Sequence, residues 1–393
     1  MARKWTCGFE LQSVAAGIEL DSTTGTAPTI DTGTVRSGAA SIKFNPSANT
    51  SYFTTQFTAL NSTNNFYIRF YAYFTSFPSA NSKAIALTRS TNNGNNIAIR
   101  MNTAGTIYLN DEQSGTQIGS TSSALSLNTW YRIEFSYVYS GGAANAYLNG
   151  TNFATGSGHN NVPNDSFRLG FIDSATGTYY ADDIAINDNT GTAQTGLPGA
   201  GNLIRLSPNA AGDSNGFLVQ VGGTAGSSNN FTRVNETTPD DATTYNGAAL
   251  LNAEDLFNVT DSGIGASDTV NSVSVGVRFA DITGADATAA FKIEIEKTSG
   301  GTKTQSSAIL PNSTTWRTNV PGTTLPKTYP LITYTDPDGA AWTQATLDTM
   351  QIGYIQSATN VQTIAISTIW VYVDYTPAAG GTTVKQLAML GVG

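Results

Sequence analysis

The feature that most constrains the fold is a two-residue rhythm of apolar and polar side chains. In residues 66–74 the even positions are apolar, whereas the odd positions carry Tyr67, Arg69, Tyr71 and Tyr73. Successive side chains of a β-strand point to opposite faces, so this rhythm predicts a strand with one buried face. The same reasoning predicts further strands in the first half at 41–44, 97–101, 106–109, 130–139, 144–148, 167–171 and 179–186.

The rhythm continues in the second half of the chain. Apolar residues alternate with polar ones at 273–279 and at 291–295. Near the end, Ile364 and Ile366 are in one phase and residues 369–375 are in the other, which predicts a β-bulge or a sharp bend at Ser367 and Thr368. One short helix is predicted at 343–350, with Thr343 as its N-cap and with Trp342, Leu347 and Met350 facing inward.

The composition supports an all-β fold with two domains. Charged residues make up 12% of the chain, about half of the usual share, and 39 glycines supply turns between strands. A chain of 393 residues exceeds one ordinary domain, and residues 188–202 contain almost no core-forming side chains. We therefore predict a first domain at 1–190, a linker at 191–202, a second β-sandwich at 203–377 and a flexible C-terminal tail at 378–393.

Charge and cysteine content exclude several classes of protein. The net charge is -9 and no basic run occurs, which argues against nucleic acid or an anionic membrane as a partner. Cys7 is the single cysteine, so no intrachain disulfide can form. The N-terminal residues include no apolar core of a secretory signal, and no stretch reaches the ~20 apolar residues of a membrane span. We expect synthesis in a host cytoplasm without a signal peptide.

The order of motifs in the first half resembles the concanavalin A-like lectin/glucanase superfamily, which includes laminin-G-like domains and carbohydrate-binding jelly rolls. The resemblance implies a jelly-roll sandwich for residues 1–190, and thus two β-sandwich domains in series. The motifs that carry it are at residues 8–10, 37–44, 66–74, 128–135, 147–150 and 179–186.

The resemblance also implies a candidate cofactor, a structural calcium ion. Carbohydrate-binding jelly rolls of this type often hold calcium between an N-terminal acid and an Asp-Asp pair in the last strand. Glu10 and Asp182 or Asp183 match those positions, and carboxylate oxygens suit Ca²⁺. The alternative is that these acids are solvated or bonded to turn amides.

The outward positions of residues 66–74 form a candidate sugar-binding stripe. Sugars bind on flat aromatic faces flanked by hydrogen-bonding groups, which Tyr67, Tyr71 and Tyr73 with Arg69 could supply. The competing interpretation, which we rank first, is that the stripe is covered by loops or forms an interface.

Tests for catalytic signatures favour a protein that is not an enzyme. The Glu-x-Asp-x-x-Glu cluster of the related glucanases does not occur in residues 1–190. Glu294 and Glu296 lie on one face of a strand, and we expect that face to be solvated. His159 is the single histidine, in a loop without an obvious partner, which argues against a His-rich zinc site and a Ser-His-Asp triad.

Residues 203–377 resemble domains of uncharacterised phage virion proteins, through residues 342–354 and 364–375. The first hypothesis is therefore a bacteriophage virion structural protein, exposed on the particle as a tail-associated or capsid-decoration protein. Its expected partners are other virion proteins, further copies of itself and a host surface glycan, with edge strands and the apolar residues 384–392 as attachment points. The alternatives are a glycan-active enzyme (a hydrolase or lyase) on a jelly roll and a bacterial carbohydrate-binding adhesin.

Overall fold

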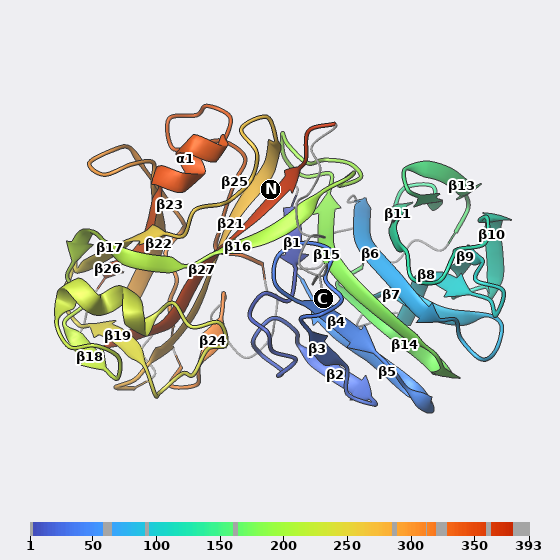
Figure 1. Cartoon of the computed structure of the whole chain (residues 1–393), viewed down its shortest axis with the longest axis horizontal. Coiled ribbons are helices and arrows are strands. Elements are labelled where there is room, and N and C mark those ends of the chain that lie inside the picture. The colour runs from blue at the N-terminus through green and yellow to red at the C-terminus, as the bar shows by residue number, and fades with distance from the viewer. Residues whose placement is uncertain are drawn as a thin grey trace, which may run out of the picture.

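The protein is almost entirely β-structure. The computed structural model describes residues 3–57, 65–90, 94–159, 164–284, 289–311, 313–319, 328–358 and 363–379. These residues form strands β1 to β27, one short α-helix, α1 (Gln344–Thr349), and one 3₁₀ turn, η1 (Ser227–Arg233) (Figure 1). No helix in these ranges is long and apolar enough to cross a membrane. The predicted all-β class with sandwich architecture is confirmed.

The first sandwich consists of two antiparallel sheets of eight and seven strands. The eight-stranded sheet has the order β13 (Thr151–Gly156), β12 (Ala143–Leu148), β11 (Trp130–Val138), β6 (Phe66–Ser76), β15 (Thr178–Asp188), β4 (Ser41–Phe44) and β3 (Thr29–Asp31), with β1 (Arg3–Cys7) paired to β15. The seven-stranded sheet has the order β10 (Thr116–Thr121), β9 (Ile107–Asp111), β8 (Gly94–Met101), β7 (Lys83–Ser90), β14 (Ser166–Thr176), β5 (Ser47–Gln56) and β2 (Ser22–Gly25). The chain crosses repeatedly between the two sheets, as in a jelly roll.

The alternation in β6 explains why these sheets stack. Phe66, Ile68, Phe70 and Phe74 point into one core with the apolar faces of β8, β9 and β14. Burying each such side chain contributes roughly 1.5–3 kcal/mol to the free energy of unfolding. This burial favours packing of the two sheets face to face. The opposite face of β6 carries the polar and tyrosine positions that the sequence singled out.

The second sandwich consists of sheets of seven and five strands. The larger sheet has the order β18 (Val219–Val221), β19 (Tyr245–Ala248), β27 (Ile364–Thr376), β21 (Thr269–Asp281) and β24 (Arg317–Thr318), with β16 (Asn202–Leu206) on β27 and β25 (Leu331–Thr333) on β21. The smaller sheet has the order β17 (Pro208–Asn215), β20 (Glu254–Val259), β26 (Gln351–Ala358), β22 (Ala290–Glu296) and β23 (Lys303–Gln305).

Two local predictions in this half are confirmed. Thr343 caps α1, because its side chain accepts a hydrogen bond from the Thr346 amide, and Trp342, Leu347 and Met350 join the second core. The register of β21 against β27 shifts so that Arg278 pairs with Thr368 and Phe279 with Ile366. Ser367 is thereby the extra residue of the predicted bulge.

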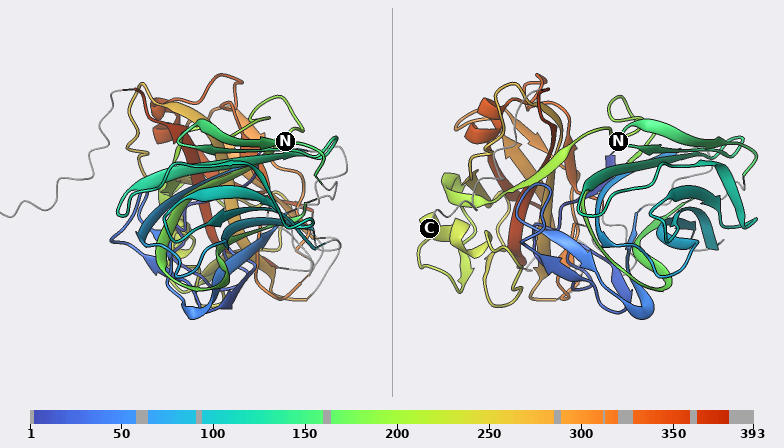
Figure 2. Two further views of the ribbon diagram at one scale, coloured as in Figure 1. Left: turned by 90° about the vertical axis from the view of Figure 1, so that its right-hand side faces the viewer. Right: turned by 45° about the vertical axis from the view of Figure 1, so that its right-hand side comes forward.

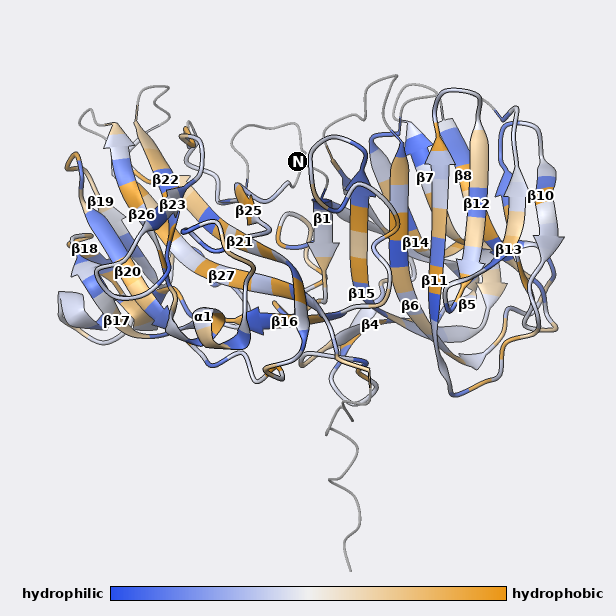
Figure 3. Ribbon diagram, turned by 90° about the horizontal axis from the view of Figure 1, so that it is seen from above, coloured by the Kyte–Doolittle hydropathy of each residue, from blue (hydrophilic) through white to orange (hydrophobic). Residues whose placement is uncertain are grey.

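The two sandwiches pack side by side, and β27 lies between their cores (Figures 2 and 3). One face of β27, with Val371 and Val373, belongs to the second core, whereas Trp370 and Tyr372 on the other face join the first core. Residues 189–201 connect β15 to β16, and Asn202 already pairs with β27. Most of the predicted tail at 378–393 lies outside the described residues.

Candidate functional site

The predicted sugar-binding stripe lies on the outer face of the eight-stranded sheet. Its middle is covered: Arg69 and Tyr71 are buried, whereas Tyr67 and Tyr73 are half-buried. The Gly201 amide donates to the Tyr71 hydroxyl at 3.3 Å, and the Arg36 guanidinium stacks on the Tyr71 ring at 3.3 Å. The four side chains therefore do not form one open stripe, because the segment that connects the two sandwiches lies across Tyr71.

Arg69 makes a structural contact between the sandwiches. Its guanidinium donates to Asp374 of β27 at 3.2 Å and to the Asp183 carbonyl at 3.1 Å. At the other end of the stripe, Tyr73 contacts Trp130 and Tyr180, with ring centroids 5.4 Å and 6.0 Å apart. The stripe thus serves mainly as packing surface.

The predicted calcium ligands all contact the segment 36–39, next to the middle of β15. A bulge in β15 brings consecutive carboxylates to the same segment, and Asp183 has a φ of 51°. Asp182 accepts from the Arg36 amide at 3.0 Å, and Asp183 accepts from the Ser37 hydroxyl at 2.5 Å and pairs with the Arg36 guanidinium. Glu10 accepts from the Ala39 amide at 2.9 Å. The three acids hold the segment 36–39.

This arrangement does not fit a calcium cage. Ca²⁺ needs six to eight oxygen ligands, but N–H, O–H and guanidinium donors already engage these carboxylates. Burial also raises the pKa of Glu10 to about 8 and raises that of Asp182 well above its ordinary value, which favours their neutral forms. The described residues contain no group of three or more acids, histidines or cysteines suited to a metal. We derive no role for calcium from these side chains.

A polar pocket lies instead on the outer face of the seven-stranded sheet. The alternation in β8 and β9 directs Ile99 and Leu109 into the core, which leaves Arg100, Tyr108 and Asn110 on the outside. The hollow has a volume of about 440 Å³. We call it the Arg100 pocket; its lining is Ser82, Arg100, Tyr108, Asn110, Glu112, Gly115 and Gln117.

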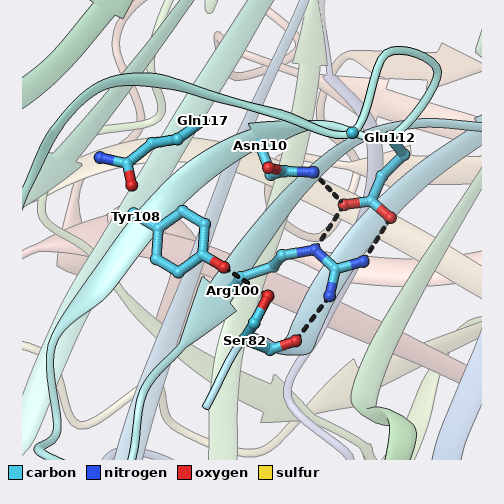
Figure 4. A pocket seen from close by; sticks show the side chains of 7 residues that line it. Ser82, Arg100, Tyr108, Asn110, Glu112 and Gln117 are labelled. Atoms are coloured by element: carbon cyan, nitrogen blue, oxygen red, sulfur yellow. Dashed lines mark hydrogen bonds and ion pairs between the residues drawn. The ribbon is translucent and has the colours of Figure 1, made fainter.

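Arg100 organises the pocket through a fixed set of hydrogen bonds (Figure 4). Its guanidinium donates to both oxygens of Glu112, at 2.7 Å and 2.6 Å, and to the Ser82 carbonyl at 2.6 Å. The hydrogen bonds that Arg100 donates to Glu112 raise the pKa of Arg100 further above its usual value. Asn110 donates to Glu112 at 2.8 Å, and the hydroxyls of Tyr108 and Ser82 are 2.5 Å apart. A bidentate Arg–carboxylate pair is rigid, so the pocket presents pre-positioned donors and acceptors.

Sequence reasoning missed the Arg100 pocket. Its signal was available, because Arg100 and Tyr108 occupy polar positions of two predicted strands, 97–101 and 106–109. The sequence does not show that these two positions are neighbours. They are neighbours because β8 pairs with β9, with Arg100 opposite Tyr108.

Two expectations about charged residues are corrected. Glu294 and Glu296 are buried rather than solvated, because side chains of neighbouring strands cover them, and Gln305 donates to Glu294. Burial raises the pKa of Glu294 to about 7. His159 has a partner, since its Nδ1 lies 3.1 Å from the Asp111 carboxylate.

Comparisons with known proteins give distant likenesses. No family model and no curated protein matches the chain. Among solved structures, the cellulose-induced protein Cip1 is 18% identical over 50% of this chain and 100% of that chain, with a TM-score of 0.38. A carbohydrate esterase from the Shiga toxin-encoding bacteriophage phi24B is 15% identical over 42% of this chain and 89% of that chain (TM-score 0.33). Domain 4 of AbnA, a GH43 arabinanase from Geobacillus stearothermophilus, is 16% identical over 48% of this chain and 93% of that chain (TM-score 0.32). Likeness at this level carries no inference about activity.

Proposed function

We propose that the protein is a non-enzymatic glycan-binding protein of a bacteriophage particle surface, and that the Arg100 pocket is its sugar site. The observation that carries the glycan proposal is the pocket itself. Its volume of about 440 Å³ lies within the range of small-molecule sites, and its polar groups are held in place before a ligand arrives. Such groups match the closely spaced hydroxyls of a sugar.

The charge of the pocket favours a neutral glycan. Glu112 neutralises Arg100, and Asp173 adds a second carboxylate 2.9 Å from the same guanidinium. An acidic sugar would be repelled by these carboxylates and by the chain's net charge of -9. A neutral hexose carries no charge and can exchange hydrogen bonds with the Tyr108 hydroxyl.

The pocket lining supports binding rather than hydrolysis. Hydrolysis by the common glycosidase mechanism needs two carboxyl groups beside the scissile bond. Glu112 is the one carboxylate in the lining, and both of its oxygens bind Arg100. The neighbouring Asp173 is engaged as well, because it accepts from Arg100 and from the Ala84 amide. Release of reducing sugar from a host polysaccharide by the purified protein would overturn the non-enzymatic part of the proposal.

The proposal that the protein belongs to a phage particle rests on the sequence. A low content of charged residues and two β-sandwich domains are typical of a protein exposed on a particle surface. Many copies on one particle would make a weak pocket useful through avidity. A reconstruction of the particle that contains this chain in symmetric copies would support this placement, and its absence from purified particles would contradict it.

Replacing Tyr108 by phenylalanine is expected to weaken binding of a neutral oligosaccharide about tenfold. The change removes the hydroxyl that bonds Ser82 and faces the hollow, and an unpaired polar partner costs about 1–3 kcal/mol. Isothermal titration with the best ligand from a glycan array measures the effect.

Tyr67→Phe is the matched control, because it removes a hydroxyl from the outer face of the other sheet. Its affinity should equal that of the wild type. If Tyr67→Phe or Tyr73→Phe weakened binding and Tyr108→Phe did not, the site would lie on the stripe instead of in the Arg100 pocket.

A further inference from the structure

Exposed apolar side chains gather at one end of the second sandwich. Leu218, Val219, Leu250 and Leu251 are 65%, 40%, 67% and 55% exposed, and they are four of the six large apolar side chains exposed among the described residues. We call these four residues the leucine corner. A clustered apolar surface of this kind marks a contact site more often than scattered single residues do.

The four residues are neighbours because two segments run antiparallel beside each other. Val219 of β18 pairs with Gly247 of β19, and the Gly216 amide donates to the Glu254 carbonyl at 2.7 Å. Leu218 lies between these two pairings on one segment, and Leu250 and Leu251 lie between them on the other. Figures 1 and 3 place β18 and β19 at the end of the second sandwich that is farthest from the first.

The leucine corner adjoins the outermost strand of its sheet in the part of the chain that the structure describes. β18 is the last strand in the order of its sheet and pairs with β19 alone among the described strands. An edge strand presents unpaired N–H and C=O groups and can accept an added strand. The surface therefore offers both backbone pairing and apolar contact.

The sequence contains a segment suited to this surface. Residues 384–392 follow the last described residue, Ala379, after a short Gly-Gly-Thr-Thr stretch. Five of the nine are large and apolar, and one is charged: Val384, Leu387, Met389, Leu390 and Val392, with Lys385. A nonapeptide of this composition is of a length that can pair with an edge strand.

Chain length argues that the segment comes from another copy. β19 pairs with β27 at Ile364–Ile366, and β27 continues away from that point to Thr376. At ~3.3 Å per residue, these ten residues carry the chain about 33 Å from the corner. The seven residues 377–383 span at most about 25 Å, so the segment cannot begin at the corner of its own chain.

We propose that residues 384–392 of one copy dock on the leucine corner of a second copy and pair with the free edge of β18. This contact joins two different surfaces, so it propagates from copy to copy until a ring closes or an open chain forms. It is independent of sugar binding and of the Arg100 pocket.

The test combines three proteins with a synthetic peptide of residues 384–392. At high micromolar concentration, sedimentation velocity should show oligomers for the full chain and monomers for a chain ending at residue 379. A full chain with Leu250→Asn and Leu251→Asn should also be monomeric. The truncated chain should bind the peptide, and the double substitution introduced into it should weaken that binding at least tenfold.

The matched control is Leu127→Asn, which changes an exposed leucine of the first sandwich. This variant should oligomerise as the wild type does, and circular dichroism should show unchanged β-structure in every variant. A monomeric full chain, oligomers that survive the truncation, or peptide binding that ignores Leu250 and Leu251 would each overturn the proposal.

Discussion

Replacing Asp374 by alanine is expected to lower the free energy of unfolding by about 3–5 kcal/mol. Asp374 accepts from Arg3 at 2.6 Å and from Arg69 at 3.2 Å, and all three side chains are buried between the sandwiches. Burial raises the pKa of Asp374, but Arg69 and Arg3 outweigh it and hold the pKa below its usual value. Removing the carboxylate would leave two guanidinium groups buried without their counter-charge, which is the costly case. Equilibrium denaturation in guanidinium chloride measures the loss.

Two further variants test whether the loss comes from the buried ion pairs of Asp374 or from removing any carboxylate. Asp338→Ala removes an exposed carboxylate that contacts Lys297 at 2.7 Å, and it should change stability by no more than about 0.5 kcal/mol. Replacing Arg3, Arg69 and Asp374 together by methionine, methionine and leucine should recover most of the loss, because no buried charge remains unpaired. Equal effects of Asp374→Ala and Asp338→Ala would contradict the structural role of Asp374.

The protein is expected to lose stability as the pH rises from about 5 to about 9, and Glu10→Gln should remove part of that loss. Burial raises the pKa of Glu10 from 4.5 to about 8, with Glu19 and Asp183 contributing in the same direction. The native state therefore binds the proton more tightly than the unfolded state. The stabilising contribution is complete below pH 4.5 and disappears as the pH rises through about 8. The full stabilising contribution is on the order of 5 kcal/mol.

The measurement is the difference in the free energy of unfolding between Glu10→Gln and wild type at each pH. At pH 5 the two should be similar, because the wild-type carboxyl is neutral in the native state; at pH 9 the variant should be more stable by several kcal/mol. Other acids also titrate here, since burial raises the pKa of Glu19 to about 6 and that of Asp255 to about 7. Asp261→Asn, on an exposed carboxylate, controls for a general change of charge. A pH-independent difference for Glu10→Gln would contradict the assignment.

The strands and their buried faces could be predicted because they depend on local order. In β6 the alternation alone identifies Phe66, Ile68, Phe70 and Phe74 as core residues. The phase slip at Ser367 likewise predicts the bulge that the register shift shows. Neither inference needs to know which strands are neighbours, because side chains alternate along any strand.

The fate of the polar faces could not be predicted in this way. Arg69 and Tyr71 have the same alternation phase as Tyr67 and Tyr73, yet the connecting segment and β27 bury the first two. Arg100 and Tyr108 became candidate site residues because β8 pairs with β9 and leaves a hollow over the pair. Whether an outward side chain meets solvent, a loop or a second sheet depends on strand order and domain docking.

The sequence by itself determined that this chain forms sandwiches of antiparallel strands, which side of most strands is buried, and where the short helix begins. Only the tertiary structure decided that Arg3, Arg69 and Asp374, up to 371 positions apart, form two buried ion pairs that share Asp374, and that the open polar hollow lies on the seven-stranded sheet. The physical reason is the distance along the sequence over which each property is determined. Burial periodicity is a property of neighbouring residues, whereas a site is made by surfaces that meet only when distant segments pack together.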